Sequence, residues 1–382
     1  MYERTTAAGG SAWVAHVFWT ESGRRRQLKR SFRSKREAKA ALAELLQAHE
    51  TDTFVEPTKT TLRAYAAVWL DGLEVQGRKA STLSGYRGAL DRYVLPTLGD
   101  TPLQDLKASQ LDALYGKLRR SGGIGGRELS LTTVHHAHAV INKMLNDAER
   151  KGLVLRNVAR LADPPSLASA RARSPELRVW TPAELSRFLS LIEGHPHEPM
   201  FRLLALTGMR RSEVVGLRWS DVDEVGCTVS VMQAVTIIDG LERVDVPKTR
   251  RSRRMIDIDP VTLGLLATHR EAQRVQLARV RRTTPIGDRV FTNEVGGTFQ
   301  PNSIGQAFHR LVDQHGLPKI RLHDLRHTHA SHLLSAGINI KVVSDRLGHA
   351  SVSFTLDTYG HVLPGDQAAA AAAAAALVAR TI

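Results

Sequence analysis

The sequence predicts a mainly α-helical, multidomain protein with a small antiparallel sheet in its C-terminal half. Apolar residues recur at helical spacing through most of the chain after residue 60. One interval, Val229 to Asp259, alternates between apolar and polar residues instead. A segment with prolines at both ends and no apolar period separates two such regions. We therefore expect an α+β N-terminal module at 1–57, a helical domain at 58–163, a linker at 164–176, a mixed α/β domain at 177–363 and a C-terminal tail at 364–382.

The N-terminal module is expected to contain two strands and a helix. Trp13–Trp19 and Gln27–Phe32 are rich in β-forming residues, and Glu21–Arg24 between them is typical of a turn. Ser34-Lys-Arg-Glu37 has the capping-box pattern that begins a helix. Nine Lys or Arg and one acid stand between Gly23 and Lys39, which favours phosphate contacts over a merely solvated face. We expect DNA contacts from Arg24, Arg25, Arg26, Lys29, Arg30 and Arg33.

Four helices are predicted in the next part of the chain. Their apolar stripes span residues 62–69, 83–93 with an end before Pro96, 103–118 and 130–150. The glycine-rich segment 121–126 is predicted to be a loop rather than a phosphate loop, because it lacks a Gly-Lys-Ser/Thr ending and a preceding strand. The linker that follows carries Arg171 and Arg173, which we also expect to contact DNA.

Composition limits the class of protein. The chain has 382 residues, 42% hydrophobic, and a net charge of +15, which favours a polyanionic partner. Nucleic acid is the first candidate and an anionic membrane surface is the second. The single cysteine, Cys227, excludes an intramolecular disulfide and a cysteine-rich zinc site, and we interpret it as a packed residue of a strand. No signal-peptide or membrane-spanning stretch is apparent, so we expect a soluble, cytoplasmic protein.

The mixed α/β domain is expected to begin at Thr181-Pro-Ala-Glu184, a capping box with proline at the first helical position. Three antiparallel strands are predicted within it, around Val229–Val231, Val244–Val246 and Ile256–Ile258. Asp239-Gly240 and residues 249–252 are the turns between them.

Two basic clusters of this domain could bind an anion. In Thr207-Gly-Met-Arg-Arg-Ser-Glu213, Gly208 ends one helix and Arg210 opens the next, which fixes the Arg210 guanidinium at a turn. Alone, this segment is equally consistent with a surface salt bridge. Lys248 stands where a strand is predicted to end, and a lysine among many cations is a competent proton donor. A phosphate clamp explains Lys248 as well, and we expect its neighbours Arg250 and Arg251 to face solvent or DNA.

Two further clusters supply histidines and a tyrosine. His323 and Arg326 are three residues apart and share one helix face. His323 and His327 have the spacing of a zinc helix, but the required glutamate and a third ligand are missing, so we favour an oxyanion role over a metal. His349 follows a glycine that can end a helix, and Tyr359 precedes another glycine.

Together these side chains form the set that attack on a phosphodiester requires. Fixed cations stabilise the charge that develops on the non-bridging oxygens. A proton donor serves the leaving 5′ oxygen, and a covalent nucleophile conserves the bond energy so that ligation needs no ATP. No carboxylate cluster suited to a catalytic magnesium ion is apparent, so no cofactor is expected.

The order and spacing of these motifs resemble the tyrosine recombinase family, the phage-type integrases in particular, over residues 175–363. The resemblance implies that Arg210 and Arg326 clamp the scissile phosphate and that Lys248 protonates the leaving oxygen. It implies that His323 transfers a proton and contacts the phosphate, and that His349 donates a hydrogen bond to it. Tyr359 would attack to give a 3′-phosphotyrosyl link, and Glu213 would have a supporting role.

The resemblance also implies functions for the other parts. Residues 58–163 would bind the core site, and residues 1–57 would bind arm sites of double-stranded DNA attachment sites. The protein would act in a bacterial cell as a homotetramer that passes through a Holliday junction, and an excisionase and a DNA-bending host protein are candidate partners. A Xer-like resolvase of the same chemistry, a non-catalytic DNA-binding regulator and, more remotely, a zinc hydrolase are the alternatives.

Overall fold

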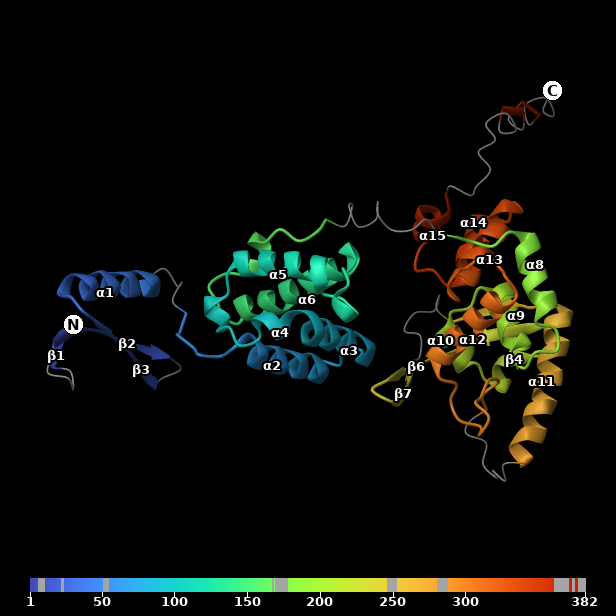
Figure 1. Ribbon diagram of the computed structural model, residues 1–382, viewed down its shortest axis with the longest axis horizontal. Coiled ribbons are helices and arrows are strands. Elements are labelled where there is room, and N and C mark those ends of the chain that lie inside the picture. The colour runs from blue at the N-terminus through green and yellow to red at the C-terminus, as the bar shows by residue number, and fades with distance from the viewer. Residues whose placement is uncertain are drawn as a thin grey trace. The chain divides into compact units, whose positions relative to one another are not determined.

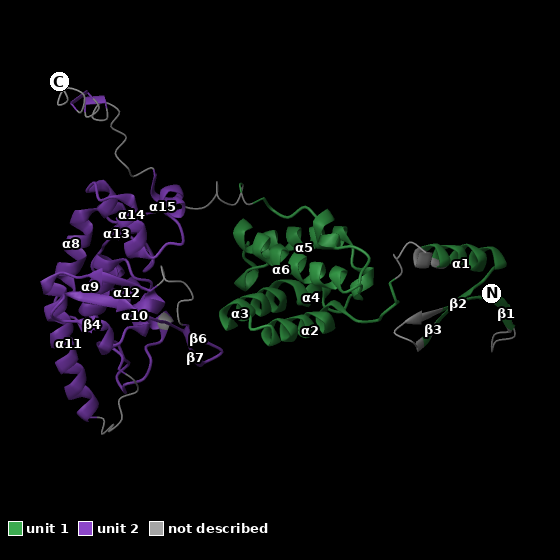
Figure 2. Ribbon diagram, turned by 180° about the vertical axis from the view of Figure 1, so that it is seen from behind, with its two compact units in different colours: residues 1–174 green, residues 175–382 purple. Residues whose placement is uncertain are grey.

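The computed structural model describes residues 1–5, 11–21, 24–50, 55–166, 168, 178–245, 253–279, 288–360, 371–372 and 375–376. The chain divides into two compact units, Met1–Ser174 and Pro175–Ile382 (Figure 2). Each unit is described by itself. None of the helices in the described ranges is long and apolar enough to cross a membrane.

The first unit begins with a three-stranded antiparallel sheet in the order β1-β2-β3, followed by a helix (Figure 1). Its elements are β1 (Tyr2–Thr5), β2 (Ser11–Glu21), β3 (Arg24–Phe32) and α1 (Lys35–Glu50). The two predicted strands are confirmed. The third strand, β1, was not predicted, because it has only four residues. The capping box is confirmed as well, because the Glu37 amide donates to the Ser34 hydroxyl and the Ser34 amide donates to the Glu37 carboxylate.

The rest of the first unit is helical around one apolar core that includes Leu62, Trp69, Leu111 and Ile141. Its α-helices are α2 (Leu62–Val75), α3 (Ala80–Ala89), α4 (Leu95–Leu98), α5 (Ala108–Ser121) and α6 (Leu131–Arg150). Shorter turns are η1 (Leu90–Val94), η2 (Leu103–Asp105), η3 (Ile124–Gly126) and η4 (Val158–Leu161).

Two predicted helix boundaries in this part are wrong. The second helix does not end before Pro96, because the π-helical turn η1 passes into α4, where proline occupies the first turn and needs no amide donor. The third helix begins at Ala108 rather than Leu103, since residues 103–105 form the separate turn η2.

The second unit packs helices around two small sheets. Its helices are α8 (Pro182–Leu191), α9 (Glu198–Thr207), α10 (Arg211–Gly216), α11 (Pro260–Arg279), α12 (Pro301–Gln314), α13 (Asp324–Ser335), α14 (Ile340–Leu347) and α15 (Val352–Tyr359), with a short turn η5 (Trp219–Asp221). The capping box at Thr181 and Glu184 is confirmed by reciprocal hydrogen bonds. Large aromatic side chains such as Trp180, Phe188 and Phe308 fill the main core.

The strands of this unit differ from the predicted three-stranded arrangement. One sheet has the order β4-β5-β8, from β4 (Val222–Asp223), β5 (Thr228–Val231) and β8 (Arg254–Asp257). A separate hairpin pairs β6 (Ala234–Ile238) with β7 (Leu241–Asp245). The turn at Asp239-Gly240 is confirmed, and both residues have positive φ as a tight hairpin turn requires. The predicted turn at 249–252 lies outside the described residues.

The interpretation of Cys227 as a packed strand residue is wrong. Cys227 lies in the turn before β5 with φ of 50°, and its side chain is only half-buried. Its carbonyl accepts a hydrogen bond from the Ile258 amide, which ties the turn to the residue after β8.

Candidate active site

Helix ends in the second unit position most of the predicted site residues. Gly208 and Gly348 adopt left-handed conformations, with φ of 66° and 68°, and end α9 and α14. Arg210 follows as the cap of α10, and His349 follows Gly348 directly. The chain leaves each helix at its glycine, and the carbonyl groups of Gly208 and Leu347 at the two helix ends both accept hydrogen bonds from Arg326.

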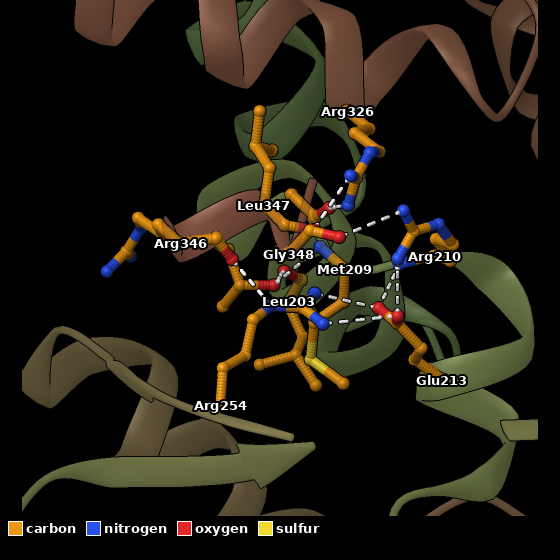
Figure 3. A network of polar contacts seen from close by, with 11 residues as sticks. Leu203, Met209, Arg210, Glu213, Arg254, Arg326, Arg346, Leu347 and Gly348 are labelled. Carbon is orange, nitrogen blue, oxygen red and sulfur yellow. Dashed lines mark hydrogen bonds and ion pairs between the residues drawn. The ribbon is translucent and has the colours of Figure 1, made fainter. Parts of the chain in front are cut away.

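The Arg326 guanidinium is buried and fixed by these same helix ends. It is 4% exposed, and its Nη1 and Nη2 donate to the carbonyl oxygens of Gly208 and Leu347 at 2.6 and 2.7 Å (Figure 3). Carbonyl groups at helix C-termini carry partial negative charge and suit a cation. Burial, followed by the charge of Arg210, lowers the pKa of Arg326 to about 9. The protein therefore holds a cation here in spite of an unfavourable environment.

Arg210 belongs to the same polar network, which continues through Glu213 and Arg254. Its Nη1 donates to Glu213 Oε1 at 2.8 Å, and its Nη2 donates to the Gly348 carbonyl at 3.4 Å. Arg254 Nη2 donates to Glu213 Oε2 at 2.8 Å, and its Nε donates to the Arg346 carbonyl at 2.7 Å. Burial opposes ionisation of Glu213, but the hydrogen bond and charge of Arg254, with Arg210, hold the pKa of Glu213 at about 2.

Positive charge exceeds negative charge in this network. The guanidinium groups of Arg210, Arg254 and Arg326 accompany one carboxylate, that of Glu213 (Figure 3). A cavity of about 520 Å³ lies beside it and is lined by Arg210, His323 and Arg326. An anion in this cavity would meet guanidinium groups that the fold already orients, which is what a phosphate site requires.

Tyr359 is buried at the end of α15 against α13. Its side chain is 1% exposed and belongs to a small apolar cluster with Leu334, Val343 and Leu347. The Tyr359 hydroxyl lies 2.7 Å from His327 Nδ1. Burial raises the pKa of Tyr359 to about 12, although the charge of Arg326 opposes the change. In this structure the hydroxyl is therefore protonated at neutral pH.

His349 and His323 are the two remaining predicted residues of the site within the described ranges. His349 Nδ1 lies 2.7 Å from the Thr355 hydroxyl, and its ring is parallel to the Tyr359 ring within 7° at a centroid distance of 6.4 Å. Burial and then the charges of Arg326 and Arg210 lower the pKa of His349 to about 4. His323, at the cap of α13, is exposed at the cavity. Five of the six predicted catalytic residues are thus close together along α10, α13, α14 and α15.

Several predicted residues lie outside the described part of the chain. They are Lys248, Arg250, Arg251, Arg171 and Arg173. Within the N-terminal sheet, Arg25, Lys29, Arg30 and Arg33 are exposed, and the Arg25 guanidinium lies 4.3 Å from the Phe18 ring centroid. The side chains of Arg24 and Arg26 are likewise not described.

Sequence reasoning missed two members of the site. Arg254, in the same basic run as Arg250 and Arg251, received no role from the sequence, but its side chain is 6% exposed and pairs with Glu213. Arg254 is two residues before Ile256 and so lies on the same face of β8, which was the available signal. His327 was weighed only as a metal ligand. Across the described ranges no group of three or more His, Cys, Asp or Glu could hold a metal ion.

The chain is similar in sequence to two family models and to several named proteins. Residues 178–365 match the family described as "Phage integrase family", and residues 61–119 match "Phage integrase, N-terminal SAM-like domain". A tyrosine recombinase XerD of Corynebacterium glutamicum is 30% identical over 318 residues, with 78% of this chain and 94% of that protein covered.

Longer alignments include an integrase and a Xer-like protein. An integrase of Streptomyces ambofaciens is 26% identical and covers 93% of this chain and 92% of its own length. A XerC-like tyrosine recombinase of Caldanaerobacter subterraneus is 26% identical, with 87% of each chain covered. Among solved structures, a Tn1549 transposon integrase in complex with a circular intermediate DNA has a TM-score of 0.63 and 22% identity, and covers 77% of this chain and 94% of that one.

Proposed function

Because the chain belongs to the phage integrase family of tyrosine recombinases, which cleave and rejoin DNA strands, we propose that it is an integrase whose nucleophile is Tyr359. One observation carries the assignment. Arg210 and Arg326 line a single cavity, and α13 both carries Arg326 and contacts the Tyr359 hydroxyl through His327. The charge of Arg326 also acts on Tyr359, so a phosphate bound to Arg326 would be near the end of α15.

The six side chains have distinct roles in this proposal. Arg210 and Arg326 bind the non-bridging oxygens of the scissile phosphate, and His349 and His323 donate hydrogen bonds to it or move a proton beside it. The Tyr359 oxygen forms a bond to phosphorus while the bond to the 5′ oxygen breaks, which leaves a 3′-phosphotyrosyl link. Lys248 gives its proton to the leaving 5′ oxygen. Ligation reverses these steps and requires no ATP.

The N-terminal sheet favours an integrase over a Xer-like resolvase. The alignment with XerD of C. glutamicum includes 94% of XerD but only 78% of this chain. The alignment with the S. ambofaciens integrase includes 93% of this chain. We assign the part of this chain that has no counterpart in XerD to the basic sheet β1-β2-β3 with its exposed arginines. We assign this module to arm-type DNA sites and residues 58–163 to the core site. The XerC-like relative, which covers 87% of this chain, keeps the resolvase as the second candidate.

The assembly follows from the same assignment. We propose a homotetramer on two double-stranded attachment sites, working through a Holliday junction in the bacterial cytoplasm. An excisionase and a DNA-bending host protein would set the direction of the reaction. The linker residues Arg171 and Arg173 would contact the DNA backbone, as would Arg250 and Arg251 of the catalytic domain.

A nicked DNA substrate tests the function directly. The nick lets the cleaved end diffuse away, so that the covalent complex accumulates and is counted on a denaturing gel. The wild-type protein is expected to form the complex on the ends of the element that encodes it, and Tyr359→Phe is expected to form none. Tyr115→Phe is the matched control, because Tyr115 is another buried tyrosine 2.8 Å from a histidine Nδ1, that of His138. A wild-type protein that binds this DNA and forms no covalent complex would instead be a DNA-binding regulator.

A further inference from the structure

Among the described residues, His327 makes a hydrogen bond with the hydroxyl of the proposed nucleophile, and none of the six catalytic roles above belongs to it. Its Nδ1 lies 2.7 Å from the Tyr359 hydroxyl, with ring centroids 5.6 Å apart. His327 follows Arg326 directly on α13. The helix that fixes the phosphate-binding guanidinium therefore also fixes the group that contacts the attacking oxygen.

The two protonation states allow the Tyr359 hydroxyl to donate this hydrogen bond to His327. Burial, and then the neighbouring His323, lower the pKa of His327 to about 4, so the imidazole is neutral at pH 7. Tyr359 keeps its proton at that pH, as described above. In the imidazole tautomer with its proton on Nε2, the phenol donates to Nδ1, and the proposal below uses this tautomer. A neutral imidazole that already accepts from the hydroxyl is prepared to take its proton.

The surroundings of His327 suit proton transfer under control of the bound phosphate. His323 and Arg321 precede it, Asp324 and Arg326 share its helix, and His349 and Tyr359 approach from α14 and α15. The cations among these groups keep the imidazole neutral before DNA binds. A phosphate diester adds a negative charge beside them, which favours the imidazolium form. The neighbouring His323 ring is edge-on to the His327 ring, with the ring centroids 5.2 Å apart. Because His323 is exposed, it offers the proton a route to solvent.

We propose that His327 is the catalytic base that removes the Tyr359 proton during strand cleavage. As the bond from Tyr359 Oη to phosphorus forms, the Oη proton passes to His327 Nδ1. The bond from phosphorus to the 5′ oxygen breaks, and that oxygen takes a proton from Lys248. In ligation the 5′ hydroxyl attacks, Lys248 recovers its proton, and His327 returns one proton to Tyr359. This inference rests on the proposed function of Tyr359.

The test compares two substitutions in single-turnover cleavage of the nicked DNA. His327→Phe keeps a ring but removes the acceptor, and we expect the cleavage rate to fall by ~100-fold at pH 7 with DNA affinity unchanged. The deficit should narrow as pH rises, because hydroxide replaces the missing base. His327→Asn keeps an oxygen near the Nδ1 position and preserves the contact without basicity, so it should remain slow. Full recovery by His327→Asn would reduce His327 to a structural hydrogen-bond partner and overturn the proposal.

A modified leaving group separates the two proton transfers. With sulfur in place of the bridging 5′ oxygen, the leaving group needs no proton donor, so this substrate should rescue Lys248→Ala but not His327→Phe. Rescue of His327→Phe would place His327 on the leaving-group side and contradict the proposal, as would wild-type cleavage by His327→Phe.

His332→Asn is the matched control, because His332 is a half-buried histidine of the same helix that contacts the Trp180 carbonyl instead. It should cleave at the wild-type rate. If His327→Phe fails to fold, the folded His327→Asn variant alone decides the outcome. Failure of the proposed function is distinct, because the wild-type protein would then form no adduct at all.

Discussion

The buried pair of Glu213 and Arg254 allows a quantitative prediction. Both side chains are nearly inaccessible, at 8% and 6% exposure, and they make two hydrogen bonds. The pKa of Glu213 is about 2 against an ordinary 4.5, which corresponds to roughly 3 kcal/mol at about 1.36 kcal/mol per pKa unit. Arg254→Met removes the main partner and leaves Glu213 with Arg210, so we expect a loss of ~3 kcal/mol at pH 7.

The stabilisation by Glu213 depends on pH. Because folding lowers the pKa of Glu213, its stabilisation is fully present above pH ~4.5 and is lost as pH falls toward ~2. In Arg254→Met the folded-state pKa rises, so this acid-dependent loss becomes smaller and occurs at higher pH.

The assay is urea unfolding, monitored by hydrogen exchange in peptides that contain β8 and α10. A single spectroscopic signal would combine the unfolding of the two compact units. Arg274→Met is the control, since Arg274 pairs with Glu271 on the solvent-exposed surface and its loss should leave the stability unchanged. Replacing both Glu213 and Arg254 with apolar residues should restore part of the loss. An Arg254→Met protein with wild-type stability and a wild-type acid profile would refute the reasoning.

Three more predictions follow from single contacts. Gly348→Ala should lower the melting temperature by several degrees, because φ is 68° and a Cβ would lie 2.8 Å from Arg254 Nη1; an unchanged melting temperature would contradict this. In DNA-free protein, His349 should titrate near pH 4 in histidine hydrogen-exchange mass spectrometry, and titration near 6.5 would contradict the burial described here. Replacing exposed Arg25 and Arg30 with Gln should reduce the salt dependence of DNA binding by about two phosphate contacts, whereas an unchanged slope would remove the N-terminal sheet from the DNA interface.

Local signals in the sequence predicted the fold where one chemical interaction decides it. The capping boxes at Ser34 and Thr181 and the glycine ends at Gly208 and Gly348 each need only a few adjacent residues. Strand pairing was predicted less well, because β6 and β7 form their own hairpin while β5 pairs with β8 across it. Partner choice between strands depends on tertiary packing, which alternation of apolar residues does not encode.

The site divides in the same way. Chemistry and motif order identified Arg210, Arg326 and Tyr359, whose types are dictated by attack on a phosphate. They did not identify His327 or the burial of Arg254, because each depends on a contact between segments far apart in the chain. Arg254 is separated from Glu213 by 41 residues, and a run of basic residues gives no sign of which one turns inward.

The central claim is that Tyr359 becomes covalently joined to a 3′ phosphate of DNA, and identification of that linkage tests it most directly. The covalent complex on nicked DNA is digested with nuclease and protease, and the modified peptide is sequenced by mass spectrometry. We predict a nucleotide attached through its 3′ phosphate to the oxygen of Tyr359. A linkage to another residue, or to a 5′ phosphate, would contradict the account.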